Sequence, residues 1–349
     1  MERKKTKKIK VGNIYIGGDS KITIQSMNNT DTRDIQGTIK QILAFENAGC
    51  DITRCAVPDL EAAEAIKKIV KNINIPLVAD IHFDYKLALK SIENGVSALR
   101  INPGNIGGET RVNAVARAAK GKNIPIRVGV NSGSVEKELL EKYGGVCPEA
   151  LVESALKHVN LLEKANFYDI VISIKSSNVI QMIESYRMIS SKVEYPLHIG
   201  VTEAGTPWRG TIKSSIGIGA LLAEGIGDTI RVSLTGDPLE EIRVGKQILK
   251  SLGYRNEGIE FISCPTCGRT KVNLIDLANK IEEKLGNCNK NIKVAIMGCV
   301  VNGPGEAREA DIGVAGGNGE FLIFKKGKIL RKTKEENLID ELINEISKM

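Results

Sequence analysis

The stretch DITRCAVPDLEAAEAIKKIVKN, residues 51–72, contains the structural unit from which most of the chain is built. Its first part, DITRCAV, is a short run rich in β-branched residues, which is typical of a buried strand. After a short loop, LEAAEAIKKIVKN repeats its apolar residues with the period of an amphipathic helix. A strand followed by a helix predicts a βα unit, whose helix returns the chain to begin a parallel neighbouring strand.

The same unit occurs eight times between residues 20 and 255. The expected strands are residues 22–27, 51–57, 76–81, 98–103, 125–130, 169–175, 196–203 and 229–235. The expected helices are residues 38–49, 60–72, 85–95, 110–121, 150–165, 179–193, 212–225 and 238–253. Eight consecutive units favour an α/β fold of the (β/α)8 TIM type over an open sheet. The segment KVGNIYIGG, residues 10–18, predicts an additional strand or hairpin at the bottom of this barrel.

Polar and charged residues gather at the C-terminal ends of the expected strands, where TIM barrels carry their active sites. They are Ser26, Arg54, Asp80, His82, Arg100, Asn102, Arg127, Asn131, Lys175, Glu203, Arg231 and Ser233. Guanidinium groups match phosphate oxygens, and clustered cations repel one another unless an anion lies between them. The pattern therefore predicts a site for a small ligand with two or more phosphates. The alternative is that these charges pair with one another or merely flank loops.

The composition limits the classes of function. The chain has 349 residues, of which 42% are hydrophobic and 26% charged, as in a soluble globular protein with more than one core. Only 4% are aromatic, which argues against a nucleic-acid-binding protein that stacks bases. The basic tail MERKKTKKIK lacks the apolar core of a secretion signal, and no apolar run approaches the ~20 residues of a membrane span. We therefore expect a cytoplasmic protein that binds neither nucleic acid nor membrane.

The repeated pattern ends near residue 256, which predicts a barrel domain over residues 1–256 and a smaller α+β domain over residues 257–349. In the second region the strand IEFISCP ends in a C-x-x-C pair, Cys264 and Cys267, and the strand IKVAIMGC ends at Cys299. The last two cysteines are 32 positions apart, the length of one helix and one strand. We therefore expect the three thiols to lie together at one end of a sheet.

Three thiolates favour zinc or an iron–sulfur cluster. A structural zinc site needs a fourth closed ligand, and the only nearby thiol is Cys288, in the polar loop GNCNKN. A cubane cluster accepts a different ligand at its fourth iron, and Glu306 follows Cys299 by seven positions, across a Gly/Pro loop. An oxygen ligand is displaced more easily than a thiolate, which would let this iron meet a substrate oxygen. The remaining cysteines are expected to be packing or surface thiols: Cys50, Cys55, Cys147 and Cys288.

Motifs along essentially the whole chain resemble those of the bacterial 4-hydroxy-3-methylbut-2-enyl diphosphate synthase family. They are SMNNTDT, ADIHF, RINPGN, RVGVNSGS and GVTEAGT in the barrel, and SCPTCGRT and MGCVVNGPGEAREADIGVAGG in the second domain. The resemblance implies an oxidoreductase of the non-mevalonate isoprenoid pathway. It would open 2-C-methyl-D-erythritol 2,4-cyclodiphosphate with two electrons and loss of water, giving (E)-4-hydroxy-3-methylbut-2-enyl diphosphate.

The resemblance also implies residue roles and partners. A [4Fe–4S] cluster would be held by Cys264, Cys267, Cys299 and Glu306, in a domain similar to one of sulfite and nitrite reductases. Glu203 would act as the acid or base on the barrel side, with Glu306 as the second catalytic residue. The substrate-binding positions would be Arg54, His82, Arg100, Asn102, Arg127, Asn131, Lys175, Arg231 and Ser233. Reduced flavodoxin or ferredoxin would deliver the electrons, and the enzyme would be a homodimer.

The connection between the domains also favours a site shared by two subunits. The last barrel helix returns the chain to the bottom of the barrel, whereas the cluster is needed at the mouth, ~30 Å away. Two other interpretations remain open. One is a barrel enzyme that acts on a sugar phosphate and carries a structural zinc domain, which iron and sulfide analysis would distinguish. The other is an iron-responsive regulator, against which the cations at the mouth argue.

Overall fold

The computed structural model describes residues 2–256, 258–286, 288, 290–299, 307–317 and 319–349. The chain forms two compact units, Met1–Arg255 and Asn256–Met349. Each unit has a hydrophobic core built from its own residues.

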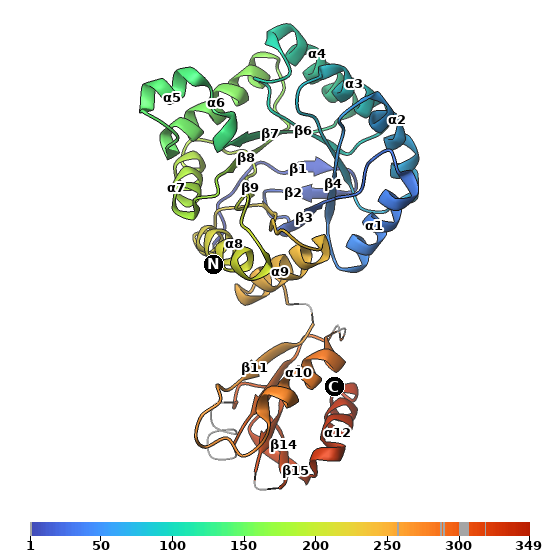
Figure 1. Ribbon diagram of the computed structural model, residues 1–349, viewed down its shortest axis with the longest axis vertical. Coiled ribbons are helices and arrows are strands. Elements are labelled where there is room, and N and C mark those ends of the chain that lie inside the picture. The colour runs from blue at the N-terminus through green and yellow to red at the C-terminus, as the bar shows by residue number, and fades with distance from the viewer. Residues whose placement is uncertain (1, 257, 287, 289, 300–306, 318) are drawn as a thin grey trace. The chain divides into compact units, whose positions relative to one another are not determined.

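The first unit is a barrel of parallel strands inside a ring of helices (Figure 1). Its strands are β3 (Thr23–Met27), β4 (Ile52–Ala56), β5 (Leu77–Asp80), β6 (Ala98–Ile101), β7 (Ile126–Asn131), β8 (Ile170–Lys175), β9 (His198–Ile199) and β10 (Thr229–Ile230). Neighbouring strands pair in parallel in the order β8-β7-β6-β5-β4-β3-β10-β9. A parallel bridge between Ile172 and Leu197 links β8 to β9, so the ring is nearly closed. The predicted TIM-type barrel is thereby confirmed.

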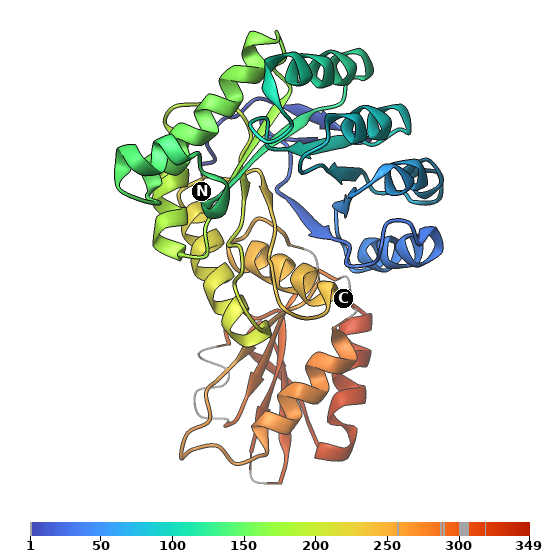
Figure 2. The ribbon, with the colours of Figure 1, turned by 45° about the horizontal axis from the view of Figure 1, so that its top comes forward.

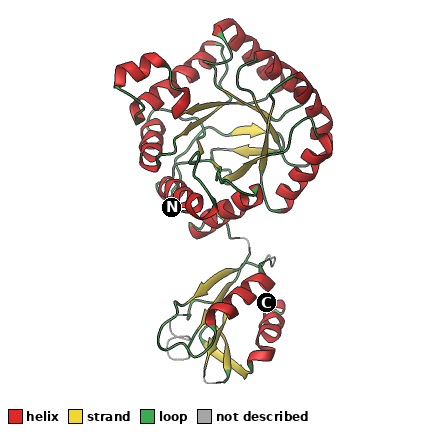
Figure 3. Ribbon diagram, in the orientation of Figure 1, coloured by secondary structure: helices red, strands yellow, loops and turns green. Residues whose placement is uncertain are grey.

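Helices follow the strands in turn and form the outer layer (Figure 3). They are α1 (Ile35–Asn47), α2 (Leu60–Ile69), α3 (Tyr85–Glu93), α4 (Gly108–Lys122), α5 (Lys137–Tyr143), α6 (Pro148–Lys164), α7 (Val179–Ser190), α8 (Pro207–Ala223) and α9 (Pro238–Ser251), with 3-10 turns η1 (Val70–Asn72) and η2 (Ser132–Ser134). Helix α2 shows why the repeat folds as expected. Asp59 caps it by accepting a hydrogen bond from the Ala62 amide at 2.9 Å, and its buried apolar stripe includes Ala63 and Ile66.

The structure differs from the sequence prediction in two places. Strands β9 and β10 have only two residues each, so Glu203, Arg231 and Ser233 lie in the loops beyond them. The backbone at Gly200 runs so close to the Arg231 carbonyl that a Cβ there would overlap its oxygen. Glu203 has a φ of 51°, in the left-handed region, which extended chain cannot adopt. Helix α5 was not predicted and occupies the loop after β7, where Leu139 is buried.

An antiparallel hairpin before the barrel closes its lower end. Its strands are β1 (Ile9–Val11) and β2 (Ile14–Ile16). Ile9, Val11 and Ile16 pack against residues near the starts of four barrel strands: Ile52, Val78, Ala98 and Val171. The hairpin crosses the centre of the helical ring in Figure 1. The predicted hairpin at the barrel bottom is confirmed, and it leaves the C-terminal ends of the strands as the open side.

In its described residues, the second unit is a five-stranded mixed sheet with helices α10 and α12 on one face. Its elements are β11 (Glu260–Ser263), α10 (Leu274–Leu285), β12 (Lys293–Met297), β13 (Ile312–Gly316), β14 (Phe321–Lys325), β15 (Lys328–Thr333) and α12 (Glu335–Ser347). The order is β11-β12-β13-β14-β15, with the first three strands parallel and the last two antiparallel. Ile281 of α10 and Leu342 of α12 share a core with Val294 of β12, and the two helices lie side by side in Figure 2.

Candidate functional site

Five cationic side chains lie inside the barrel, but at different levels. Lys175 and Arg231 lie at the C-terminal ends of their strands, as predicted, whereas Arg127 is the second residue of β7 and lines a small pocket with Val11 and Ile16 of the hairpin. Arg54, Arg100, Arg127 and Lys175 belong to β4, β6, β7 and β8, and Arg231 directly follows β10. The four strand residues are between 5% and 8% exposed. The strand register pairs Asp80 with Arg100 and Arg100 with Arg127, which brings charged residues of adjacent strands to one level. The structure therefore brings these cations together inside the barrel, while their role as an anion site stays a prediction.

Asp80 is the counter-ion for one side of this cluster. Its Oδ1 lies 3.3 Å from Arg100 Nη1, and its Oδ2 lies 3.6 Å from both Arg54 Nε and His82 Nε2. Burial alone would raise the pKa of Asp80, but Arg54, the hydrogen bond from His82 and Arg100 together lower it well below its usual value. Asp80 therefore stays ionised, and it contacts one side of the guanidinium group of Arg54 and one side of that of Arg100.

Arg100 crosses the inner face of β7 at a glycine. Its Nη2 donates to the carbonyl of Gly129 at 3.3 Å. A Cβ at position 129 would overlap the Arg100 guanidinium, so a glycine is needed for this path. Gly129 lies two residues after Arg127 and two before Asn131 in β7. Because alternate residues of a strand point to the same face, the guanidinium of Arg127 and the amide of Asn131 lie on one face, with the side-chain-free Gly129 between them.

Arg127 is the most weakly compensated guanidinium of the cluster. Its Nη1 donates to Gln25 Oε1 at 2.7 Å, while Nε and Nη2 are buried without a hydrogen-bond partner in the described part of the chain. Burial first, then Arg54 and Arg100, hold the pKa of Arg127 well below the usual arginine value. Buried polar groups in folded proteins are normally paired. The chain therefore provides no acceptor for two nitrogens of this buried cation in its described residues.

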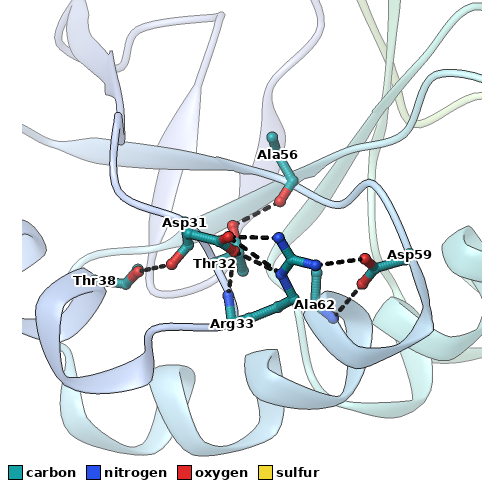
Figure 4. Close-up of polar contacts among 7 residues, drawn as sticks. All are labelled: Asp31, Thr32, Arg33, Thr38, Ala56, Asp59 and Ala62. Carbon is teal, nitrogen blue, oxygen red and sulfur yellow. Dashed lines mark hydrogen bonds and ion pairs between the residues drawn. The ribbon is translucent and has the colours of Figure 1, made fainter.

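Arg33, on the rim, shows what a fully compensated arginine looks like in the same barrel (Figure 4). Its Nε and Nη2 donate to Asp31 at 2.9 and 2.6 Å, and its Nη1 lies 3.2 Å from Asp59 Oδ2. Thr32 donates to the Ala56 carbonyl at 2.6 Å, which ties the loop after β3 to the end of β4. This exposed network is structural, whereas the cations inside the barrel lack comparable partners.

Glu241 is a second counter-ion that the sequence analysis missed. It is 5% exposed in the first turn of α9, where its Oε1 accepts from the Leu234 amide at 3.0 Å and its Oε2 from Ser26 Oγ at 3.1 Å. Oε2 also lies 3.7 Å from Arg231 Nε. A carboxylate on the buried face of an otherwise apolar helix stripe, beside Ile242, was the available signal.

Lys175 has a different environment from the arginines. It is 6% exposed at the end of β8, and its amine has no carboxylate or hydrogen-bond partner among the residues that the structure describes. Burial, followed by Arg231, Arg54, Arg127 and Arg100, holds the pKa of Lys175 well below its usual value. Nearby His198 is fully buried, with Nδ1 3.3 Å from Thr229 Oγ1.

The other predicted site residues are less tightly held. His82 is exposed apart from its contact with Asp80, and Asn102 is buried and accepts a hydrogen bond from the Gly104 amide at 3.1 Å. The Asn131 amide donates to Ser134 Oγ at 2.9 Å. Ser233 is half-buried, and Glu203 is exposed in its loop without a side-chain partner in the described residues. The structure therefore brings the cations together, but it does not place Glu203 among them.

The cysteines of the second unit follow adjacent parallel strands. Cys264 comes directly after β11, and its Sγ accepts a hydrogen bond from the Gly298 amide, after β12, at 3.2 Å. The Lys271 amide donates to the Gly298 carbonyl at 3.1 Å, so the two loops are joined. Cys267 is exposed, and hydrogen bonds from the Arg269 backbone and side chain lower its thiol pKa. Cys299 is half-buried next to Gly298.

These thiols suit a soft metal or a cluster, because amide hydrogen bonds to sulfur and a lowered thiol pKa both favour thiolates. Glu306 lies outside the described residues. Within the described ranges, no group of three or more His, Cys, Asp or Glu side chains is close enough to hold a metal ion. The remaining cysteines are free and are used in packing: Cys50 and Cys55 are buried, and Cys147 caps α6.

Comparison with solved structures supports the barrel fold. The type I 3-dehydroquinate dehydratase of Clostridium difficile covers 71% of this chain and 98% of its own, with a TM-score of 0.52 and 16% identity. The dihydropteroate synthase of Xanthomonas albilineans gives a TM-score of 0.51 at 11% identity, with the same coverage of both chains. At these identities the likeness concerns the fold alone. In the described residues, no helix combines the length and apolar character needed to cross a membrane.

Fold and site residues together define a two-domain protein, a TIM barrel with cationic residues in its interior followed by a domain with strand-end thiols. The chain belongs to the GcpE family: residues 6–246 match the GcpE TIM-barrel domain, and residues 260–348 match the GcpE protein C-terminal domain. A protein of Clostridium perfringens is 72% identical over 343 residues, 98% of either chain, and one of Clostridium acetobutylicum is 69% identical over the full length of both. Both are named 4-hydroxy-3-methylbut-2-en-1-yl diphosphate synthase (flavodoxin).

Proposed function

We propose that this chain is an oxidoreductase that converts 2-C-methyl-D-erythritol 2,4-cyclodiphosphate to (E)-4-hydroxy-3-methylbut-2-enyl diphosphate. This two-electron ring opening with loss of water is a step of the non-mevalonate isoprenoid pathway. Family membership and the names of full-length relatives support the assignment. The observation that carries it is the barrel interior, where four arginines and the amine of Lys175 have only Asp80 and Glu241 as nearby carboxylates among the described residues. A diphosphate would supply the missing negative charge.

The barrel residues would bind the substrate and neutralise the charge that develops on it. Arg127 has two unpaired nitrogens for phosphate oxygens, and Arg54 and Arg100 keep free edges because Asp80 holds only one side of each. As the ring opens, the oxygen that leaves carbon remains on the diphosphate with its electron pair. Guanidinium groups already fixed in the strands would stabilise that oxygen without reorganising.

The second unit would hold the redox centre. Cys264, Cys267 and Cys299 would bind a [4Fe–4S] cluster, with Glu306 as the fourth ligand. The hydrogen bond from Gly298 to Cys264 Sγ and the lowered pKa of Cys267 fit such a role. When bound, the cluster would supply the two electrons and a Lewis-acidic iron for a substrate oxygen. Reduced flavodoxin, which the relatives' name includes, or ferredoxin would be the electron donor.

Glu203 is our proposed acid or base on the barrel side, and its exposure lets it exchange protons with water. We expect Glu203→Gln to lower kcat while the Kd for the cyclic diphosphate stays unchanged. A lower affinity with unchanged kcat would instead assign Glu203 to binding. The chemistry is proposed to take place in the cytoplasm, where thiols stay reduced, in keeping with the free state of all seven cysteines.

The enzyme is further proposed to be a homodimer with an active site shared between subunits. Helix α9 follows β10 and runs back toward the closed end of the barrel, so the chain leaves the first unit far from the cations. Two-fold symmetry would create two equivalent shared sites. Mixing Arg127→Met chains with Cys299→Ser chains tests this, since a shared arrangement leaves one site of the heterodimer intact. Purified heterodimers without any activity would contradict it.

The central test of the assignment is anaerobic turnover. Protein purified without oxygen is incubated with the cyclic diphosphate and reduced flavodoxin, and the linear diphosphate product is measured by mass spectrometry. We expect product, together with iron and acid-labile sulfide in the ratio of a [4Fe–4S] cluster. One zinc per chain without sulfide, or iron-loaded protein that leaves the cyclic diphosphate unchanged, would refute the proposed function.

A further inference from the structure

Lys175 stands out among the cations of the barrel because it has nothing to balance its charge. Asp80 contacts Arg54 and Arg100, and Glu241 contacts Arg231. Neither carboxylate contacts Lys175 in the described part of the chain, and its amine makes no hydrogen bond there. The residue is nevertheless 6% exposed, so water cannot solvate the amine freely. An isolated ammonium in such a place is strongly disfavoured.

The groups that face Lys175 are cationic or neutral. Arg54, Arg100, Arg127 and Arg231, from four different strands or their loops, all repel a positive charge on it. His198 of β9 is close enough to be affected by Lys175 in turn. On the helix side of β8, Tyr186 of α7 accepts a hydrogen bond from the Ile174 amide, and burial raises its pKa, so it stays neutral. In the part of the chain that the structure describes, none of these facing groups provides a negative charge.

Among these groups, the lysine is the one whose charge can change. Arginine keeps its proton in proteins, whereas a buried lysine readily loses one. The pKa of Lys175 is held well below its usual value by burial and by the four arginines. His198 is already neutral, because burial first and Arg127 second lower its pKa as well, and its Nδ1 is engaged with Thr229. The burial of Lys175 and the charges around it thus both favour the neutral amine.

We propose that Lys175 is a proton carrier of the barrel, an amine that is neutral in the ligand-free protein and gains one proton from solvent when a phosphate-bearing anion binds. Protonation uses the nitrogen lone pair to form an N–H bond, and no oxidation state changes. The bound anion supplies the counter-charge that the fold does not, which favours the ammonium. The use of this proton in the reaction rests on the proposed function. Loss of a hydroxyl as water consumes a proton, and Lys175 would bring one into the interior together with the substrate.

Calorimetry of the oxidised holoenzyme measures this proton directly, because turnover cannot occur without reductant. Binding of the cyclic diphosphate is measured at about pH 8 in several buffers that differ in ionisation enthalpy. The slope of the observed binding enthalpy against the buffer ionisation enthalpy gives the number of protons taken up. A cyclic diphosphate does not titrate in this range, so any proton belongs to the protein. We expect an uptake close to one proton and, between the free and bound pKa values of Lys175, a Kd that rises about ten-fold per pH unit. No uptake at any pH at which binding occurs would overturn the proposal.

Two variants of the same position assign the proton. Lys175→Met removes the amine, and Lys175→Arg keeps a charge that cannot be released, so both should bind the anion without proton uptake. His198→Gln is the matched control, since His198 is the other buried titratable group facing the site, and it should retain the uptake. Uptake that persists in either lysine variant, or disappears in His198→Gln, would overturn the assignment. If neither lysine variant folds, retention of the uptake in both His198→Gln and His82→Gln decides for Lys175, because the arginines do not titrate.

A second probe separates this inference from the proposed function. Trimetaphosphate is a cyclic anion that has no titrating group near neutral pH, and it can be used in place of the cyclic diphosphate in the same calorimetry. If the cyclic diphosphate fails to bind but trimetaphosphate binds with proton uptake, the proposed substrate is wrong and the role of Lys175 stands. If both bind without uptake, the substrate stands and the role of Lys175 is wrong.

Discussion

The barrel cations and the cysteines belong to the parallel strands of two different sheets, but they are held in different ways. Arg54, Arg100, Arg127 and Lys175 lie on the strands themselves and are almost fully buried. Cys264, Cys267 and Cys299 lie in loops just beyond their strands, and they are exposed or half-buried. The barrel therefore presents a site whose geometry exists before any ligand binds. The cysteine site depends on what it binds.

The barrel cations and the cysteines should also affect the stability of the fold differently. Burying several like charges destabilises a protein unless counter-ions are present, and in the described residues the barrel provides Asp80 and Glu241 alone. If the proposed function is right, the barrel gives up stability for a preformed anion site. The thiols cost the fold little, because solvent reaches them, and a bound cluster would add stability to their unit by mass action. Substitutions in the two regions should therefore differ in kind as well as in size.

The largest effect is expected at the cysteines. Cys299→Ser should remove the cluster and with it all activity, because no other thiol follows β12 in the described residues. Iron, acid-labile sulfide and turnover are measured on anaerobically purified protein. Cys288→Ser is the matched control, since Cys288 packs at the edge of the small core and should retain cluster and activity. A Cys299→Ser protein with full iron and sulfide content would remove Cys299 from the ligand set.

Within the barrel the largest effect is expected at Arg127. Replacing it by Met removes the guanidinium that has two unpaired nitrogens but keeps an apolar side chain of similar length. Loss of one charge-assisted contact should cost about 1.5–3 kcal/mol of binding free energy, or roughly a 10- to 150-fold increase in Kd for the cyclic diphosphate. The variant should retain its iron. An unchanged Kd would contradict an anion site at this position.

Lys175→Met should stabilise the ligand-free protein, by about 1 kcal/mol or more, because it removes an unpaired buried amine beside four arginines. The folded pKa of Lys175 lies below the unfolded one, so the unfolded chain binds more protons between them. Wild-type stability therefore gains from rising pH in that window, and the variant should lack this gain. Thermal or urea unfolding from neutral to alkaline pH measures both effects. A Met variant that is less stable at every pH would contradict the account.

The smallest effect is expected at Arg33, whose exposed guanidinium is paired with Asp31 and Asp59 on the rim. Exposed ion pairs contribute little, so Arg33→Met should change the Kd for the cyclic diphosphate by less than about two-fold. The same titration as for Arg127→Met measures it, so it serves as a matched arginine control. An Arg33 variant that binds as poorly as the Arg127 variant would show that net charge alone determines affinity.

Much of this organisation could be read from the sequence, because parallel βα units impose it. Once eight strands were recognised, residues at their C-terminal ends, such as Lys175, had to lie at the same end of the barrel. Arg127 was expected there too, but it is the second residue of β7 and pairs with Val171, four residues before Lys175. Glu203 was placed at a strand end because PLHIGVTE alternates like a strand, but β9 stops at Ile199. Local periodicity cannot show that Gly200 must pass close to the carbonyl of Arg231.

The counter-ions were harder to predict, because they depend on contacts distant in sequence. Glu241 lies on a helix that looks amphipathic in the ordinary way, and only the packed barrel shows that its carboxylate faces Ser26, 215 positions away. Gln25 likewise becomes visible as the partner of Arg127 only across 102 positions. Sequence patterns thus indicated which charges gather, but they could not show which of those charges are compensated.

The central claim is a division of labour, in which the barrel binds the anion and the second unit carries the redox centre. Parallel measurement of bound iron and of the Kd for the cyclic diphosphate in Arg127→Met and Cys299→Ser tests it most directly. We predict that Arg127→Met keeps its iron and binds the cyclic diphosphate at least ten-fold more weakly. We predict that Cys299→Ser loses its iron and still binds the anion within about ten-fold of the wild-type Kd. Loss of both properties in both variants would contradict the account.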